Sequence, residues 1–401
     1  MDNFFYNLKN KYIFLICTIF FLSQLLTVRF FFTSKYIIYD RFFIWLFYVF
    51  FSTLIFFIIL KKKEILKIIT SKYVFYFFLL IFLVFLLILY PIADAQKINK
   101  MGIDQDDCII NFIENLKQNK FPYNLTYLGN PCSTGIMELL FYFPVLLWKN
   151  YFSIIPAISL IIFYYLVKIF TNHINAVLFT LFQLGNLLFL EMSSAGSDFI
   201  LIAISYPFGL FLAYKGFQDS KKYLLFISLF FLCFFYGSRV ILFFLLPVNL
   251  FLFYIKFGSK VFRLFLAIFL LVFLSYFIPW LINPKMFTPF HILEKGMHLL
   301  YFVKFYLLTF FVILFLISRK INFPKIIFIH KKNNFFALNI FFYVIPIFFV
   351  CFADLIENKM LSKWEGLNYF LLIIPSIYLL INLYLSKLFI INKNSITNLY
   401  Y

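Results

Sequence analysis

Apolar runs of roughly 18 to 22 residues recur along this chain from one end to the other. A helix rises about 1.5 Å per residue, so each run is long enough to cross the roughly 30 Å hydrocarbon core of a bilayer. The chain is 64% hydrophobic and 13% charged, whereas a soluble domain is about half apolar and a quarter charged. We therefore predict an all-α, polytopic membrane protein.

The runs define about twelve candidate transmembrane helices in a single domain over residues 1–401. They lie at 13–33, 42–60, 73–92, 151–170, 175–190, 199–216, 222–237, 240–255, 262–281, 300–317, 335–353 and 368–389. The longest polar interruption is the segment 93–150. We expect any chemistry to be carried by this segment and the other loops on its side of the membrane.

The net charge of +19 would suggest a nucleic-acid partner in a soluble protein. In a membrane protein, loop Lys and Arg residues instead set the orientation and meet anionic headgroups, so we expect the bilayer as partner and no nucleic acid. The densest basic clusters lie at 61–72, 215–222, 256–263 and 318–334. Twelve spans place all four on the side of both termini, which the positive-inside rule assigns to the cytoplasm.

This count depends on residues 135–150, which are apolar but short and interrupted by Pro144. A full span there would move the clusters 215–222 and 318–334 to the outer side. We therefore predict that 135–148 forms a juxtamembrane or re-entrant helix at the outer interface.

Acidic residues gather in the segment 93–150, where Asp104, Asp106, Asp107 and Glu114 are four of the 16 in the chain. Asp104 followed by Asp107 fits an N-cap with an acidic residue at N3, which predicts an amphipathic helix over 105–119. Capping does not require three carboxylates. Close carboxylates repel by roughly 1–4 kcal/mol per pair near a surface, and sites that keep them raise a pKa or recruit a cation. A capped, solvated loop and a functional site both remain open.

Three motifs accompany these acids: DQDD at 104–107, PY at 122–123 and TYLGNP at 126–131. In this order, after a run of spans, they resemble the first outer loop of the GT-C class of glycosyltransferases, and most closely the loops of bacterial membrane proteins of that class. SAGSD ending at Asp198, the pair Ser238–Arg239 and WEGLNY at 364–369 are weaker matches.

The resemblance implies a GT-C-like fold with juxtamembrane helices in a catalytic periplasmic loop, here 93–150, and makes 1–72 an additional N-terminal hairpin. It implies a multi-pass enzyme of the bacterial inner membrane whose active site faces the periplasm. Such an enzyme moves a sugar, with inversion, from a polyprenyl-phosphate donor to a hydroxyl of a glycan, lipid or protein acceptor.

By position, Asp104 matches the general base of that class. Asp106 and Asp107 would support it or hold a divalent cation, Mg²⁺ or Mn²⁺. The substrate-binding candidates are Asp106, Asp107, Tyr123, Asn130, Asp198, Arg239 and Glu365.

Several of these residues also have simpler interpretations. Arg239, near the end of a span, could bind the donor phosphate as a bidentate guanidinium or extend its charged head to the interface. Asp198 could be only a helix cap. An O-antigen-polymerase-like enzyme and a transporter or flippase for lipid-linked sugars are the alternative functions; a transporter predicts charges within spans and broken, repeated helices.

Cys108 and Cys132 both fall in the segment 93–150. In an oxidising periplasm a disulfide between them would close a loop of about 25 residues, which is worth roughly 3 kcal/mol. Two reduced thiols are the alternative. Cys17, Cys233 and Cys351 lie in apolar runs, where we expect them to be small core residues.

Overall fold

A computed structural model describes residues 10–25, 38–99, 104–146, 148–291, 332–358 and 368–385 of the chain. The described residues are helical or form turns and loops, apart from one isolated bridge between Leu125 and Pro131. The helices of seven or more residues are α2 (Asn10–Gln24), α4 (Ile38–Lys61), α5 (Lys63–Ile69), α6 (Lys72–Ala95), α7 (Gln105–Lys117), α9 (Ile155–Phe170), α10 (His173–Gly185), α11 (Leu187–Ser194), α12 (Phe199–Gln218), α13 (Lys222–Ser238), α15 (Leu246–Phe257), α16 (Phe262–Ile282), α20 (Lys332–Asn358) and α21 (Phe370–Leu385).

Five stretches of helix among the described residues are long and apolar enough to cross a membrane, or six if the bent pair α10–α11 counts as one span. α2, α13 and α21 are apolar but shorter in their described parts. The predicted all-helical class agrees with this architecture, which fits a multi-pass membrane protein. A count of twelve spans is not established, and the predicted span 300–317 lies outside the described residues.

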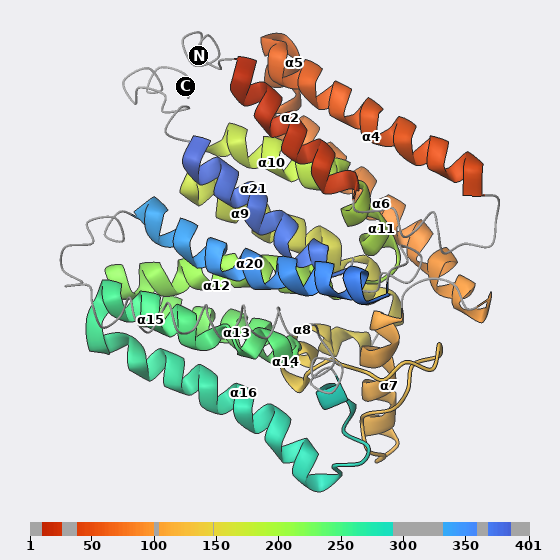
Figure 1. Cartoon of the computed structure of the whole chain (residues 1–401), viewed down its shortest axis with the longest axis vertical. Helices are drawn as coiled ribbons and strands as arrows, with labels where there is room; N and C mark the ends of the chain where they lie inside the picture. The colour runs from red at the N-terminus through yellow and green to blue at the C-terminus, as the bar shows by residue number, and fades with distance from the viewer. Residues whose placement is uncertain are drawn as a thin grey trace.

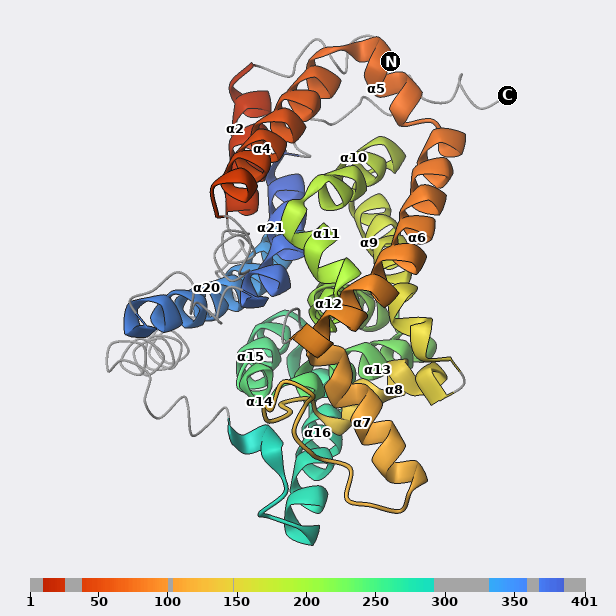
Figure 2. The ribbon, with the colours of Figure 1, turned by 90° about the vertical axis from the view of Figure 1, so that its right-hand side faces the viewer.

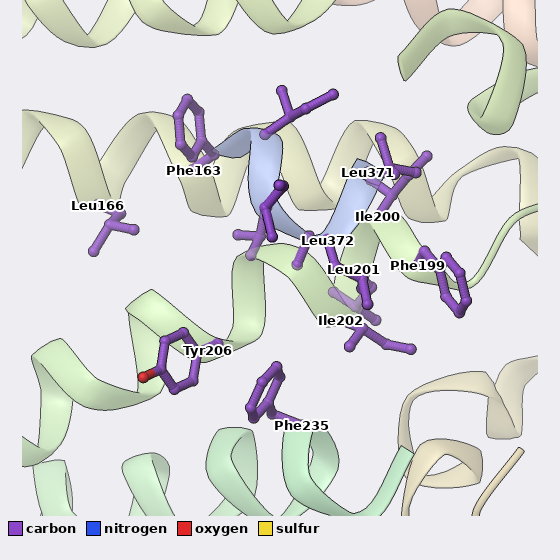
Figure 3. Packing of buried hydrophobic residues seen from close by; sticks show 14 of the residues in the cluster. Phe163, Leu166, Phe199, Ile200, Leu201, Ile202, Tyr206, Phe235, Leu371 and Leu372 are labelled. Atoms are coloured by element: carbon purple, nitrogen blue, oxygen red, sulfur yellow. The ribbon is translucent and has the colours of Figure 1, made fainter. Parts of the chain in front are cut away.

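The helices differ in how much of their surface is covered. In an apolar 18-residue stretch of α12, 89% of the residues are buried, whereas only 22% are buried in the corresponding stretch of α6. Figure 3 shows buried side chains of α12 in one packed cluster with Phe163 of α9, Phe235 of α13 and Leu372 of α21. The long apolar side chains that α4, α6 and α16 leave exposed would form very large patches in water, so these faces suit contact with lipid.

The described basic segments 61–72, 215–222 and 256–263 lie at one end of the bundle, together with Lys332 at the start of α20. His173 Nε2 lies 2.9 Å from the backbone oxygen of Thr70, which joins the start of α10 to the loop before α6. Lys332 lies over the rings of Phe170 and Phe211, at 4.7 and 5.4 Å from their centroids. α7 and α11 lie toward the opposite end, to the right of the centre of Figure 1.

The N-terminal helices pack onto the same bundle. Gln24 Nε2 of α2 donates to Ser52 Oγ of α4 at 3.1 Å, and Tyr48 of α4 donates to the backbone oxygen of Gly185 at 3.1 Å. One connected cluster of buried residues extends from Ile13 in α2 to Leu379 in α21.

Three predicted elements need correction. The span expected over 240–255 is divided into α14 (Val240–Phe243) and α15 by a turn at 244–245. The single helix expected over 135–148 consists of three consecutive short helical segments of alternating type, η3 (Ile136–Glu138), α8 (Leu139–Tyr142) and η4 (Phe143–Leu146). Pro144 lies inside η4 and has no N–H with which to continue the α-helical hydrogen bonds of α8. The span expected over 175–190 bends by 68° between α10 and α11. Asn186 at the bend caps α11 by accepting a hydrogen bond from the backbone N–H of Phe189 at 3.2 Å.

Candidate functional site

The amphipathic helix expected over 105–119 is present as α7 and ends before Pro122. Ile109 and Ile113 of its predicted apolar stripe are buried, whereas Leu116 is 52% exposed. Figure 2 looks onto this end of the molecule, with α7 and the loop that follows it in orange and gold. The acids at the start of α7 are therefore held on the bundle by the first two turns of the helix.

Asp104 takes the N-cap position of α7 but makes no capping hydrogen bond with its side chain. Its Oδ2 instead accepts two hydrogen bonds, from Thr126 Oγ1 and from Asn130 Nδ2, both at 2.7 Å. Its Oδ1 has no hydrogen-bond partner among the described residues, and the side chain is partly exposed. The predicted capping role is thus replaced by a fixed carboxylate with one open oxygen.

The TYLGNP motif supplies both donors because it forms a tight turn. Thr126 N–H donates to the Asn130 carbonyl, and Gly129 N–H donates to the Thr126 carbonyl, each at 2.9 Å. Gly129 has a φ of +84°, a left-handed conformation that a residue with a Cβ adopts only with strain. The turn brings Thr126 and Asn130 to the same oxygen of Asp104, so the two motifs form one structural unit.

Asp106 and Asp107 turn away from Asp104 and bind Lys97, a residue that the sequence interpretation missed. Lys97 Nζ lies 2.6 Å from Asp106 Oδ1 and 2.8 Å from both Asp107 Oδ1 and Asp94 Oδ1. Tyr90 donates to Asp106 Oδ2 at 2.9 Å. Asp106 is fully buried and Asp107 nearly so, which removes both from direct contact with a substrate in this conformation.

The charge balance of this cluster perturbs its titration. Burial raises the pKa of Asp106 to about 7, and the charge of Asp107 adds to this, while Lys97 and Tyr90 act in the opposite direction. Burial favours the neutral amine of Lys97, but the three carboxylates outweigh it and raise the pKa of the ammonium. Three carboxylates around one ammonium leave an excess of negative charge, which uptake of a proton by Asp106 relieves.

The predicted metal site at Asp106 and Asp107 can be tested against this geometry. One oxygen each from Asp94, Asp106 and Asp107 lie within 4.8 Å of one another, a donor set that suits a divalent cation. Lys97 Nζ, however, contacts all three oxygens at 2.6–2.8 Å and takes the central position. A metal ion between these carboxylates would have to displace the ammonium, which is the cation that contacts all three residues in this structure.

A second charged cluster lies between α12 and α13. Arg239 donates through one terminal nitrogen to Glu138 Oε2 at 2.6 Å and through the other to Asp198 Oδ2. The first nitrogen also donates to the Ser238 carbonyl at 2.8 Å, and the guanidinium lies 5.2 Å from the ring centroid of Phe199. Both carboxylates are 0% exposed and Arg239 is 2% exposed, so the cluster is enclosed.

This arrangement differs from both interpretations of Arg239. The side chain does not extend to an interface, and its two terminal nitrogens are committed to carboxylates rather than open to a phosphate. Asp198 takes the N-cap position of α12, but its carboxylate binds Arg239 instead of capping the helix. Burial, and then the nearby Asp198, raise the pKa of Glu138, a partner that the sequence interpretation did not single out.

Tyr123 belongs to the same enclosed region. It is 2% exposed, and its ring lies between Phe112 and Phe287, at centroid distances of 5.2 and 5.0 Å. Burial is the main cause that raises its pKa, with Glu138 contributing. Tyr123 therefore lies in the core of the loop, and its predicted contact with a substrate has no exposed ring face here.

The loop before α12 joins the two clusters. Ser197 Oγ donates to Gln105 Oε1 at 2.5 Å, next to Asp104 in the chain. Gly196, with a φ of +77°, approaches so closely that a Cβ would lie 2.6 Å from the Tyr90 ring and 3.1 Å from Asp106 Oδ2. Only glycine fits both the conformation and the space. The SAGSD motif thus packs against the start of α7 and presents Asp198 to Arg239.

A disulfide and a backbone contact hold the remainder of the loop. Cys108 and Cys132 form a disulfide with a Cα–Cα distance of 5.3 Å, which resolves the alternative that the sequence left open. Gly135 N–H donates to the Ser238 carbonyl at 2.9 Å, and a Cβ on Gly135 would lie 1.8 Å from the Gly237 carbonyl oxygen. The loop is therefore fixed at both ends, to α7 and to α13.

Glu365 lies outside the described residues, so its predicted role has no structural counterpart here. Lys97, Asp94 and Glu138 belong to none of the sequence motifs that pointed to a site. The spacing of Asp94 and Lys97, one helical turn apart at the end of an apolar run, is the one signal that could have indicated them. No family model, characterised protein or solved structure matches the chain in comparisons with known proteins.

Proposed function

We propose that this protein is a membrane glycosyltransferase that moves a sugar from a polyprenyl-phosphate donor to a hydroxyl of a glycan, lipid or protein acceptor, with inversion. The observation that supports it most directly is the Asp104 carboxylate. One of its oxygens accepts hydrogen bonds from Thr126 and Asn130, and the other has no hydrogen-bond partner among the described residues. Its acidic neighbours Asp106 and Asp107 are buried on Lys97.

In the proposed reaction Asp104 Oδ1 takes the proton of the acceptor hydroxyl while that oxygen attacks the anomeric carbon. The bond from the anomeric carbon to the phosphate oxygen breaks, and the lipid phosphate leaves with the electron pair. The two hydrogen bonds to Oδ2 fix the plane of the carboxylate before the acceptor arrives, which lowers the cost of orientation. No step is assigned to a metal ion, because Lys97 occupies the acidic cluster.

The proposed location is the bacterial inner membrane, with Asp104 on the periplasmic side. α7 lies at the end of the bundle opposite the basic loops 61–72 and 215–222, which the positive-inside rule places in the cytoplasm. The disulfide Cys108–Cys132 adds to this, because disulfides persist in oxidising compartments.

Transfer of labelled sugar from a panel of polyprenyl-phosphate donors to acceptors, with purified protein, tests the proposal. Asp104→Asn should reduce transfer by about 10²–10⁴-fold, because an amide cannot accept the proton. Asn130→Ala, which removes one of the two donors, should give a smaller loss. Glu114→Gln, on the exposed face of the same helix, is the matched control and should be unaffected. Asp104→Asn with more than about a tenth of the activity would refute a general base.

One observation favours a second candidate, a transporter or flippase of lipid-linked sugars. The 68° bend between α10 and α11 is a broken helix within the bundle, as transporter sites often have. Asn186 at this bend is satisfied by α11, Ser23 and Tyr378, and so offers no open group. Movement of a fluorescent lipid-linked sugar across liposomes, unchanged in Asp104→Asn, would favour this candidate.

A further inference from the structure

A groove of about 400 Å³ lies on the lateral surface of the bundle between α6 and α9. Tyr76 and Leu80 of α6 and Ala157, Ile161 and Tyr165 of α9 contribute to its lining, which is almost entirely apolar. Its volume falls in the range of sites for small molecules, about 300–1,000 Å³. α6 is among the least covered helices, so the groove opens toward the surface that we assign to lipid.

Two exposed lysines, Lys72 and Lys168, lie about one helical turn beyond the lining residues at one end of the groove. Phe75 and Tyr164 stack at this end with ring centroids 4.8 Å apart. Lys168 Nζ lies 5.6 Å above the Tyr164 ring and 5.9 Å above the Tyr165 ring, and Lys72 lies one turn before Phe75 on α6. Among the described residues neither lysine forms an ion pair with an acid. An apolar groove with two ammonium groups about one turn beyond its end is complementary to an apolar chain with an anionic head.

The surroundings increase the positive charge at this end. Residues 61–72 contain five lysines and one glutamate, and the hydrogen bond from His173 to the Thr70 carbonyl holds this segment at the same end as α10. A cationic site next to helices of membrane-spanning length attracts anionic headgroups. Tyr76 and Tyr165, 55% and 49% exposed, have the amphipathic rings that are enriched at headgroup level.

We propose that this groove binds one anionic phospholipid, with an acyl chain along α6 and α9 and the headgroup phosphate at Lys72 and Lys168. Lipid tails are as apolar as the groove, so contact with the chain contributes little selectivity. The two ammonium groups provide the selectivity, since each lysine near an anionic headgroup contributes attraction. The site is separate from Asp104 and does not depend on the proposed transfer reaction.

Native mass spectrometry of the full chain, purified in detergent and depleted of lipid, tests the proposal. The probes are phosphatidylglycerol and phosphatidylcholine with identical acyl chains. We expect phosphatidylglycerol to bind at least fivefold more tightly. Lys168→Gln should reduce its affinity about fivefold, equivalent to about 1 kcal/mol, and leave phosphatidylcholine unchanged. Ile161→Trp, which fills the groove from a 43% exposed position, should abolish the preference.

Two matched controls separate the groove from general surface effects. Lys260→Gln removes an exposed lysine from the loop before α16, and Leu266→Trp enlarges a side chain that is 57% exposed on α16. Both should keep the phosphatidylglycerol preference. The proposal would be overturned if the two lipids bound the unmodified protein with equal affinity. It would also be overturned if the control variants lost as much affinity for phosphatidylglycerol as Lys168→Gln and Ile161→Trp do. A dimer that Ile161→Trp abolishes would overturn it too and assign the groove to a second copy.

Discussion

Arg239→Met should be one of the most destabilising single substitutions in the protein. Arg239 is the one described cation in contact with Glu138 and Asp198, and both carboxylates are 0% exposed. Removing one partner of a buried ion pair typically costs about 3–5 kcal/mol, because a charge remains buried without compensation. Here two carboxylates would remain, so we expect a loss of at least about 4 kcal/mol of the free energy of unfolding.

Asp198→Asn should have a much smaller effect. The cluster contains two carboxylates and one guanidinium, so replacing one carboxylate by a neutral amide of the same shape leaves a balanced pair between Arg239 and Glu138. The amide oxygen can still accept a hydrogen bond from Arg239. We expect a loss of about 1 kcal/mol, the value of weakening one hydrogen bond.

Unfolding in detergent micelles with increasing fractions of sodium dodecyl sulfate, followed by circular dichroism, measures both effects. The test is which of the two variants loses more of the free energy of unfolding. The triple variant Arg239→Met, Asp198→Asn and Glu138→Gln should recover most of the stability, because it contains no buried charge. Arg239→Met within about 1 kcal/mol of the unmodified protein, or Asp198→Asn as damaging as Arg239→Met, would refute this account of the cluster.

Three further predictions concern the start of α7. Lys97→Met should leave three carboxylates without a cation, so that Mn²⁺ or Ca²⁺ raises the temperature at which this variant unfolds. The unfolding temperature of the unmodified protein should change neither with these ions nor with a chelator. Equal stabilisation of both proteins would contradict the role of the ammonium. Since burial raises the pKa of Asp106 to about 7, the folded protein binds one more proton than the unfolded chain between about pH 4 and 7. Stability should therefore fall as the pH rises from about 4 to about 7, by up to about 1.4 kcal/mol per unit, and should level off above about pH 7. Asp106→Asn should flatten this dependence, and an unchanged slope would exclude Asp106 as its source. Cys108→Ser together with Cys132→Ser should cost roughly 3 kcal/mol, and mass spectrometry after alkylation without reductant should find neither thiol modified in the unmodified protein.

The positions of most of the described helices are predictable from this sequence. Most of the apolar runs that the structure describes are helices that begin and end within a few residues of the expected positions, because a long apolar segment in a membrane must satisfy its own backbone hydrogen bonds. The run 300–317 lies outside the described residues. α7 was predictable from its periodicity and from Pro122, and the TYLGNP turn from Gly129. The apolar pattern did not indicate the change of helix type before Pro144, the turn at 244–245 or the bend at Asn186, because it continues through all three.

The partners of the charged residues were not predictable in the same way. Periodicity specifies which face of a helix a side chain occupies, but it contains no information about which distant helix lies opposite. Arg239 meets Glu138 from 101 residues away and Asp198 from 41 residues away, and only the packing of η3, α12 and α13 brings them together. In a medium of low polarity each such charge must find a partner, and the available partners depend on the completed bundle.

The sequence by itself therefore determined an all-helical chain with several helices of membrane-spanning length and an acidic segment at one end. The tertiary structure decided the roles of the acids in that segment. Lys97 neutralises Asp106 and Asp107, and the turn at Thr126–Asn130 orients Asp104. Three carboxylates within four residues look equivalent along the chain. They differ in the fold because burial penalises each charge according to the cations and donors that surround it.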